Sequence, residues 1–267
     1  PRRCRLSNRN TSGTMRGLLA QLLLIVLLAD PAGVEADPRW LLRALPGSYP
    51  DVTYFIPTDA QAIALTIDDG VDPRTTPAIL DALQSYGVTA TFFLLSDSIA
   101  GNEALVRRII EEGHEIGHHM TGDEITVLLP DGELARKFAE AADKLEAYGT
   151  VNWFRPGTGF YDARMRALSV RHGYRIALAS IAPIDTLLAD ATRMAAFIDW
   201  AIEPGSIVVL HDVGARGHRT EQTLHILLPR LLERGFQVMS LSRLAGLAAG
   251  QENRPIGSAE SPALRQQ

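Results

Sequence analysis

The sequence predicts an α/β fold in which parallel strands alternate with helices inside a single domain. Segments with strand character alternate with segments of helical periodicity about seven times, without a break in composition. The first strand, residues 62–67, is largely apolar and ends directly in Asp68, Asp69 and Gly70. Barrels and doubly wound sheets both collect ligands and catalytic groups at the carboxyl ends of their strands, so either arrangement fits.

The amino-terminal segment is predicted to be an export signal. Residues 1–14 are basic and polar, and Met15 precedes an apolar run over 17–29 that has the length of a signal-peptide core. Residues 34–36, Val-Glu-Ala, form a cleavage-site pattern, so we expect residues 1–36 to be upstream residues plus a signal peptide. We therefore expect a secreted, periplasmic or envelope-associated protein with no stable membrane span after cleavage; an uncleaved anchor close to the lipid is the alternative.

Composition excludes several classes of partner. With 46% hydrophobic and 21% charged residues in 267, the chain can bury a large core. Removing residues 1–36 leaves 21 basic and 29 acidic residues with no basic cluster, which argues against binding to nucleic acid or to an anionic membrane surface. Cys4, the single cysteine, lies in the removed part, so the mature chain has no disulfide. The oligomeric state is left open.

The elements follow one another in a regular order after a mostly irregular lead-in over residues 37–60. Ile79, Leu80 and Leu83 recur at helical spacing before Gly87 ends the first helix. Later strands are expected at 88–95, 114–117, 151–154, 174–180, 206–210 and 237–240, and helices at 75–86, 103–112, 133–148, 162–172, 191–202, 220–233 and 241–247. The polar segment 250–267 is predicted to be a disordered tail, which makes 61–249 the domain.

Polar side chains at further strand ends suggest a site. His119 and Asp123 are four residues apart, and a helical turn there would place both on one face, where they could chelate a metal. Imidazole and carboxylate suit Zn²⁺, and Co²⁺, Ni²⁺ or Fe²⁺ would also be accepted. The alternative is that these are polar loop residues without a ligand.

Three later strands also end in ionisable residues. Arg155 could hold a carboxylate ionised or form a surface salt bridge of small value. Asp185 follows the strand ending at Ser180 and alone carries no information. His211 follows a buried strand, where a lone histidine is more often structural, but the convergence of four such strand ends favours a functional site.

Five separated motifs carry a family resemblance. They are TIDDG at 66–70, ATFF at 90–93, GHEIG at 113–117, FRP at 154–156 and SIVVLHD at 206–212. In this order they resemble the polysaccharide deacetylase family, also called carbohydrate esterase family 4 or the NodB homology domain, from about residue 60 to 245. The resemblance implies a distorted (β/α)7-type barrel with a divalent metal at the carboxyl-terminal rim and removal of acetyl groups from amino sugars.

The resemblance also implies roles for single residues. Asp68 would be the general base, with Arg155 orienting it, and His211 the general acid. Asp69 and His119 would bind the metal. Asp185 would belong to the network around the acid or the base, and Val209 would line the place of the acetyl methyl group.

The chain departs from the family pattern at several positions. Asp123 stands where a second metal histidine is usual, so the implied ligands are Asp69, His119 and Asp123, a more acidic set than usual. His118 replaces an asparagine and is a spare ligand candidate. Gly157 and Thr158 replace a proline and a tyrosine, although the Thr158 N–H could still stabilise an oxyanion.

The function predicted is metal-dependent hydrolysis of an acetyl amide C–N bond, or of an acetyl ester, on a carbohydrate. The partner would be an acetylated oligo- or polysaccharide. One alternative is a catalytically silent carbohydrate-binding or scaffold protein, since several motifs are altered. The other is a deacylase for a non-sugar amide or ester, because Thr186 replaces the tryptophan of the fourth motif.

Overall fold

The structure is a computed structural model that describes residues 51–183 and 190–252. The predicted signal peptide, most of the lead-in, the positions of Asp185 and Thr186, and residues 253–267 lie outside the described residues. None of the helices in the described part is both long and apolar enough to cross a membrane.

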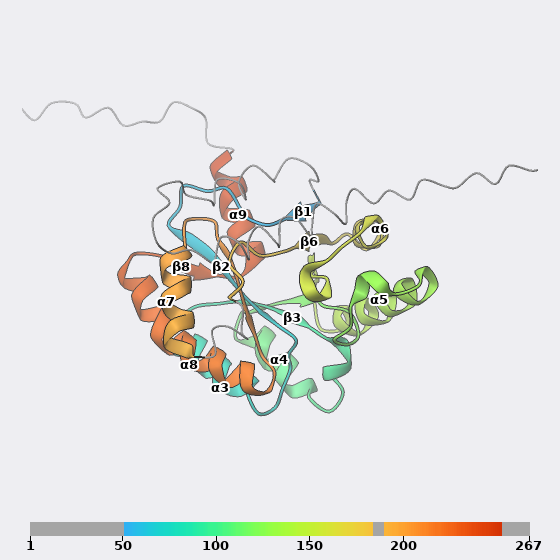
Figure 1. The fold of residues 1–267 in the computed structure, drawn as a ribbon, viewed down its shortest axis with the longest axis horizontal. Coiled ribbons are helices and arrows are strands. Elements are labelled where there is room, and N and C mark those ends of the chain that lie inside the picture. The colour runs from blue at the N-terminus through green and yellow to red at the C-terminus, as the bar shows by residue number, and fades with distance from the viewer. Residues whose placement is uncertain (1–50, 184–189, 253–267) are drawn as a thin grey trace, which may run out of the picture.

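The described strands form one parallel sheet in the order β1-β6-β5-β4-β3-β2-β7, and β8 also pairs with β2 (Figure 1). The strands are β1 (Val52–Thr53), β2 (Ala62–Asp68), β3 (Thr91–Leu94), β4 (Glu115–His118), β5 (Trp153–Phe154), β6 (Arg175–Ala177), β7 (Ile207–His211) and β8 (Gln237–Met239). The α-helices are α3 (Thr76–Ser85), α4 (Glu103–Glu111), α5 (Asp131–Glu146), α6 (Ala163–Arg171), α7 (Ala191–Ala201), α8 (Gly214–Glu233) and α9 (Leu241–Glu252). Short 3₁₀ turns lie at η1 (Ser96–Ser98), η2 (Thr126–Leu128) and η3 (Gly157–Gly159).

The sheet closes on itself next to β7. Just after β6, the backbone N–H groups of Ser180 and Ile181 both donate to the carbonyl of Ile207 at 3.1 Å, and the N–H of Val209 donates back to Ile181 at 2.9 Å. These bonds join the two sides of the curved sheet and leave the helices outside it. The predicted fold class, a distorted barrel of alternating strands and helices, is confirmed.

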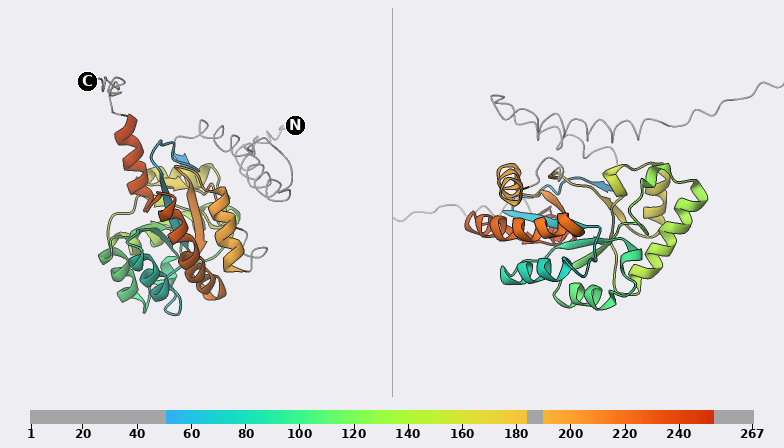
Figure 2. Two further views of the ribbon diagram at one scale, coloured as in Figure 1. Left: turned by 90° about the vertical axis from the view of Figure 1, so that its left-hand side faces the viewer. Right: turned by 60° about the horizontal axis from the view of Figure 1, so that its bottom comes forward.

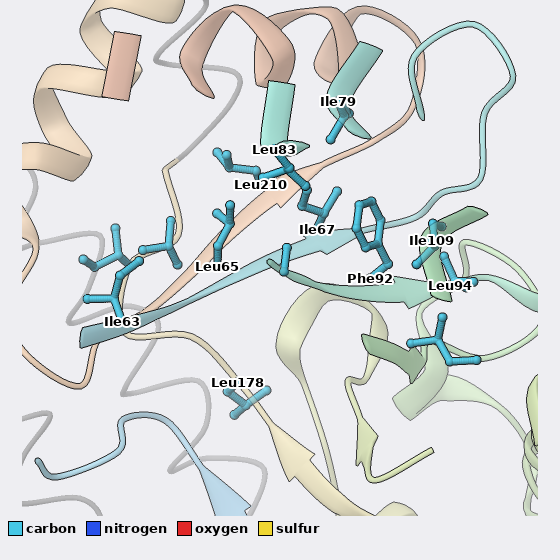
Figure 3. Packing of buried hydrophobic residues seen from close by; sticks show 14 of the residues in the cluster. Ile63, Leu65, Ile67, Ile79, Leu83, Phe92, Leu94, Ile109, Leu178 and Leu210 are labelled. Carbon is cyan, nitrogen blue, oxygen red and sulfur yellow. The ribbon is translucent and has the colours of Figure 1, made fainter. Parts of the chain in front are cut away.

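The two faces of β2 serve different purposes. Side chains alternate along a strand, so Ile63, Leu65 and Ile67 face the helical layer. Leu65 and Ile67 lie on the side of α3, towards its residues Ile79 and Leu83 (Figure 3). The opposite face points into the barrel. It carries the residues Ala62, Ala64, Thr66 and Asp68. Small side chains along this interior face leave room for long polar side chains from neighbouring strands.

The barrel interior is apolar at its amino end. The side chains that fill this end come from several strands and from α9, and they include Trp153, Ile207, Met239, Leu241 and Leu244. The carboxyl-terminal end of α9 extends away from the barrel (Figure 2). The charged interior side chains of the site lie at the opposite end, at the carboxyl ends of the strands.

The predicted elements are all present, and most of their bounds differ by a few residues from the expected ones. Two residues of the lead-in pair as β1 beside β6, and α9 continues past residue 249. The larger difference is that α8 begins at Gly214, whereas its periodicity predicts a start at residue 220. A carboxylate oxygen of Asp72 accepts the Gly214 N–H at 3.1 Å, and this distant partner stabilises a first turn that has no apolar periodicity.

Candidate active site

Strand register brings the site residues to one edge. In the pairing of β2 with β7, Thr66 lies beside Val209 and Asp68 lies beside His211. Residues paired in parallel strands share a face, so these side chains all belong to the interior. The N–H of Asp212 also donates to the carbonyl of Asp68 at 2.9 Å, which fixes the end of β7 against the end of β2.

Arg155 and Asp68 form a buried ion pair. The Arg155 Nη1 group donates to Asp68 Oδ1 at 2.6 Å and to the hydroxyl of Thr66 at 2.7 Å, and both charged side chains are no more than 6% exposed. The other guanidinium nitrogens donate to the carbonyls of Ala177 and Leu178, at 3.1 and 3.3 Å. The fixed guanidinium holds one Asp68 oxygen, and the second oxygen faces His119.

His119 is oriented by the backbone. Its Nδ1 donates to the carbonyl of Arg155 at 2.7 Å, so Nε2 faces the two carboxylates, 3.5 Å from Asp69 Oδ1 and 4.0 Å from Asp68 Oδ2. Burial alone would lower the pKa of His119, but the hydrogen bond to Asp69 and both carboxylate charges raise it overall.

Asp69 is held between His119 and Arg216. Its Oδ2 lies 2.9 Å from the Arg216 guanidinium, which comes from the first turn of α8. Burial would raise the pKa of Asp69, but the hydrogen bond from His119 and the charges of His119, His211 and Arg216 lower it overall. The backbone of Asp69 is in the left-handed region, with φ 78°, and this turn directs its side chain away from the strand.

A buried carboxyl group supports this edge from beneath. Asp212 Oδ1 accepts the hydroxyl of Thr75 at 2.6 Å, and its Oδ2 accepts that of Thr76. Burial and the nearby negative charges of Asp72 and Asp69 raise the pKa of Asp212, whereas the two threonine hydrogen bonds lower it. The net effect is a pKa of about 7. The group therefore ties the end of β7 to the start of α3.

Asp123 is not brought to the site. The helical turn needed to place it beside His119 does not form, because Met120 adopts φ 72° and residues 121–124 form bends. Its side chain is exposed, and the described residues contain no cluster of three His, Cys, Asp or Glu groups that could hold a metal. In this structure Asp123 therefore does not complete the expected ligand set of Asp69, His119 and Asp123, which stays a prediction.

His118 is a structural residue and not a spare ligand. It points to the helical side of β4, where its Nε2 donates to the carbonyl of Phe138 at 3.0 Å and its ring stacks on that of Phe138. Its Nδ1 accepts the N–H of Met120 at 3.2 Å. Complete burial lowers the pKa of His118 to about 3, so this ring is neutral.

The remaining predicted residues divide between the interior and the rim. Val209 is buried on the interior face beside Thr66. Thr158 is exposed in η3 with φ 60°. Gly157 is needed for close packing, since a Cβ at this position would lie 2.8 Å from the Glu124 carbonyl oxygen. Asp185 lies outside the described residues.

Two site residues escape prediction from the sequence. Thr66 supports Arg155 through its hydroxyl, and its place two residues before Asp68 on the same strand face is a signal that was available. Arg216 gives no such signal, because the first turn of α8 looks like a polar loop.

The donor set does not fit the metal that the resemblance implies. The orientation of His119, fixed through Nδ1, is that of a typical ligand, and Asp69 is beside it. A catalytic zinc site generally takes three protein ligands, and only these two of the three expected residues lie together. One oxygen of Asp69 is in addition bound to Arg216.

Sequence comparisons find similar proteins over most of this chain. A family profile described as polysaccharide deacetylase matches residues 56–177. A peptidoglycan-N-acetylglucosamine deacetylase of Bacillus cereus is 30% identical over 196 residues, which cover 72% of this chain and 92% of that protein. A chitooligosaccharide deacetylase of Bradyrhizobium is 29% identical over 218 residues, covering 76% of this chain and 97% of that protein.

Solved structures share the barrel. A family 4 acetyl xylan esterase from Clostridium thermocellum, in complex with a cobalt ion, superposes with a TM-score of 0.64 at 27% identity, covering 70% of this chain and 91% of that one. A CE4 family pseudoenzyme from Bacillus anthracis superposes with a TM-score of 0.68 at 22% identity, covering 74% of this chain and 70% of that one. Thus the same barrel is found in an esterase and in a pseudoenzyme.

Proposed function

Because this chain belongs to the polysaccharide deacetylase family, we propose that it removes acetyl groups from an acetylated carbohydrate at the carboxyl edge of the barrel. The observation that carries the proposal is the buried Asp68–Arg155 pair beside His119, in register with His211. This arrangement supplies a fixed carboxylate base and an imidazole acid on adjacent strands, as hydrolysis of an amide or ester requires.

In the proposed reaction, Asp68 and His211 each carry out one proton transfer. Asp68 takes a proton from a water molecule while the oxygen of that water attacks the acetyl carbonyl carbon. Arg155 keeps the Asp68 carboxylate oriented. The N–H of Thr158 stabilises the oxyanion, and Val209 contacts the acetyl methyl group. His211 then protonates the leaving amine or alkoxide as its bond to the carbonyl carbon breaks, and acetate is released. No step is assigned to a metal, because the donor set does not fit one.

The relatives support a proposal for the substrate class and for the location of the protein. N-acetylated glucosamine polymers or oligomers are the first substrates to test, since similar proteins are named for peptidoglycan and chitooligosaccharide deacetylation. Peptidoglycan is a cell-wall polymer outside the cytoplasm, which is consistent with the signal peptide proposed for residues 1–36.

A second function is favoured by one observation. Asp123 is exposed and Arg216 is bound to Asp69, and this combination fits a protein that binds acetylated carbohydrate without turning it over. The two functions differ in whether acetate is released.

Asp68→Asn tests the proposal. We expect acetate release from acetylated chito-oligomers or acetylxylan to fall by ~10²–10⁴, because the amide cannot accept the proton of the attacking water. The matched control is Asp81→Asn, which alters an exposed carboxylate on the outer side of α3 and should keep the wild-type rate. Acetate is measured enzymatically, with a chelator and, separately, with added Co²⁺ or Zn²⁺.

The wild-type rate decides between the two functions. If the wild-type protein binds the oligomers but releases no acetate under either condition, the silent carbohydrate-binding function is correct. If D68N releases acetate at the wild-type rate, the assignment of the base is wrong.

A further inference from the structure

We propose that Arg216 takes the electrostatic place of a divalent cation beside Asp69, so that this chain binds such cations only in competition with its own side chain. The proposal concerns the charge balance of the site and does not depend on whether acetate is released. It begins from the mismatch between the implied metal and the residues that the structure brings together.

The contact itself is close and partly enclosed. The Arg216 Nη2 atom lies 2.9 Å from Asp69 Oδ2, and the side chains of Arg216 and Asp69 are 38% and 8% exposed. The other oxygen of Asp69 faces His119 Nε2 at 3.5 Å. Both carboxylate oxygens therefore already face positive or proton-donating groups.

Packing of the first turn of α8 brings Arg216 to this place. Gly217 lies against Thr75, and a Cβ there would be 2.6 Å from the Thr75 side chain, so only glycine allows the turn to come so near α3. Asp72 accepts the N–H of Gly214 at 3.1 Å and so anchors the start of the turn. Arg216 sits between these two anchored glycines, and its position is set by backbone packing.

The loss of a third ligand and the presence of Arg216 reinforce each other. A cation bound only by Asp69 and His119 would lack a third protein ligand. The guanidinium of Arg216 would also repel it. Asp69 without a metal would be a buried carboxylate in need of a counter-charge, which Arg216 supplies. The two arrangements exclude each other at Asp69 Oδ2.

Isothermal titration with Co²⁺ alone, without substrate, tests the competition. We expect Arg216→Gln to bind Co²⁺ roughly tenfold more tightly than the wild-type chain, because it removes a positive charge next to the ligand oxygens. Arg230→Gln is the matched control, since Arg230 lies on the same helix, is 45% exposed and pairs weakly with Asp199 at 4.0 Å. Its affinity should equal that of the wild type.

Two further variants locate the effect. Asp69→Asn in the R216Q background should abolish the gain, and Arg216→Lys, which keeps a positive charge, should bind as weakly as the wild type. If R216Q does not fold, as judged by circular dichroism, Arg216→Met replaces it and keeps most of the aliphatic stem. The proposal is overturned if the wild type binds one Co²⁺ per chain as tightly as the folded Arg216 variant, or if the D69N change leaves the gain intact. Neither outcome depends on acetate release, so the proposed function can fail or stand separately.

Discussion

Arg155 shows how a single residue acquires its role from partners far away in the chain. Its guanidinium donates hydrogen bonds to Thr66, Asp68, Ala177 and Leu178. The guanidinium carbon Cζ also lies over the Phe93 ring, 4.1 Å from the ring centroid. Almost every donor is occupied, so the group has one orientation. Removal of either partner of a buried ion pair leaves the other charge uncompensated, which typically costs ~3–5 kcal/mol of stability. The alternative of a weak surface salt bridge is therefore wrong.

Two adjacent histidines differ because a strand directs neighbouring side chains to opposite faces. His119 faces two carboxylates, and its pKa is raised despite the cost of burial. His118 faces aromatic rings, where burial lowers its pKa to about 3. The sequence His-His-Met does not show that one histidine faces the site and the other faces the aromatic core. This difference depends on the strand β4 ending at His118.

His118→Asn should flatten the pH dependence of stability. In the unfolded chain, His118 takes up a proton near pH 6.5, whereas in the folded chain it does so only near pH 3. Between these values the unfolded state binds the extra proton, so the stability of the wild type falls as the pH falls. At pH 5 the loss due to this ring is up to about 2 kcal/mol.

The measurement for His118 is urea unfolding at pH 7 and pH 5. The variant will be less stable than the wild type at pH 7 because it leaves a gap beside Phe138, so the comparison concerns the change with pH. An equal loss of stability in both proteins would show that His118 does not titrate as the structure indicates.

At the scale of elements, the apolar pattern of a segment predicts those strands and helices that are stabilised by burying that same apolar face. The apolar alternation of β2 and the helical spacing in α3 are sufficient for both elements, because each buries the face that its own sequence makes apolar. The first turn of α8 depends instead on Asp72 and Thr75, which lie over a hundred positions earlier in the chain. The site residue on that turn, Arg216, could not be found for the same reason.

The segment after β4 shows the opposite error. Spacing by four residues suggests that His119 and Asp123 share a helix face, but spacing has this meaning only inside a helix. The left-handed Met120 breaks any such turn, and the loop instead packs the carbonyl of Glu124 against Gly157. A glycine in place of the family's proline makes this close approach sterically feasible.

Asp212→Ala should loosen the junction between β7 and α3. Both threonine hydroxyls bonded to Asp212 are buried; Thr76 would lose this acceptor, and Thr75 would keep only the long bond to the Asp212 backbone carbonyl, at 3.4 Å. Leaving one buried donor unsatisfied and weakening the bond of the other costs about 2–4 kcal/mol, measured as the free energy of unfolding in urea. Asp212→Asn keeps one acceptor and should lose less, whereas the exposed Asp81→Ala should be within about 0.5 kcal/mol of the wild type. Equal stability of D212A and D81A would contradict this role.

At the scale of the molecule, the residues proposed for catalysis and the apolar residues that close the barrel lie at opposite ends of it. Its carboxyl edge carries the buried charges, and its amino end is sealed by apolar side chains, including two from α9. Composition and periodicity predict alternating strands and helices but leave a barrel and a doubly wound sheet equally open. The difference lies in backbone hydrogen bonds from residues 180–181 to β7, which no side-chain pattern records. Only the motif resemblance favoured the barrel.

Leu244→Ala tests this separation. Leu244 is fully buried where α9 closes the amino end of the barrel, so its truncation should lower the free energy of unfolding by ~2–5 kcal/mol. Leu232→Ala is the matched control, because that side chain is 39% exposed on α8 and its loss should cost much less. Below the temperature at which it unfolds, L244A should bind and turn over acetylated chito-oligomers as the wild type does, since catalytic groups lie at the other end of the strands. A change in substrate affinity at unchanged fold would mean that the closing helix also shapes the site.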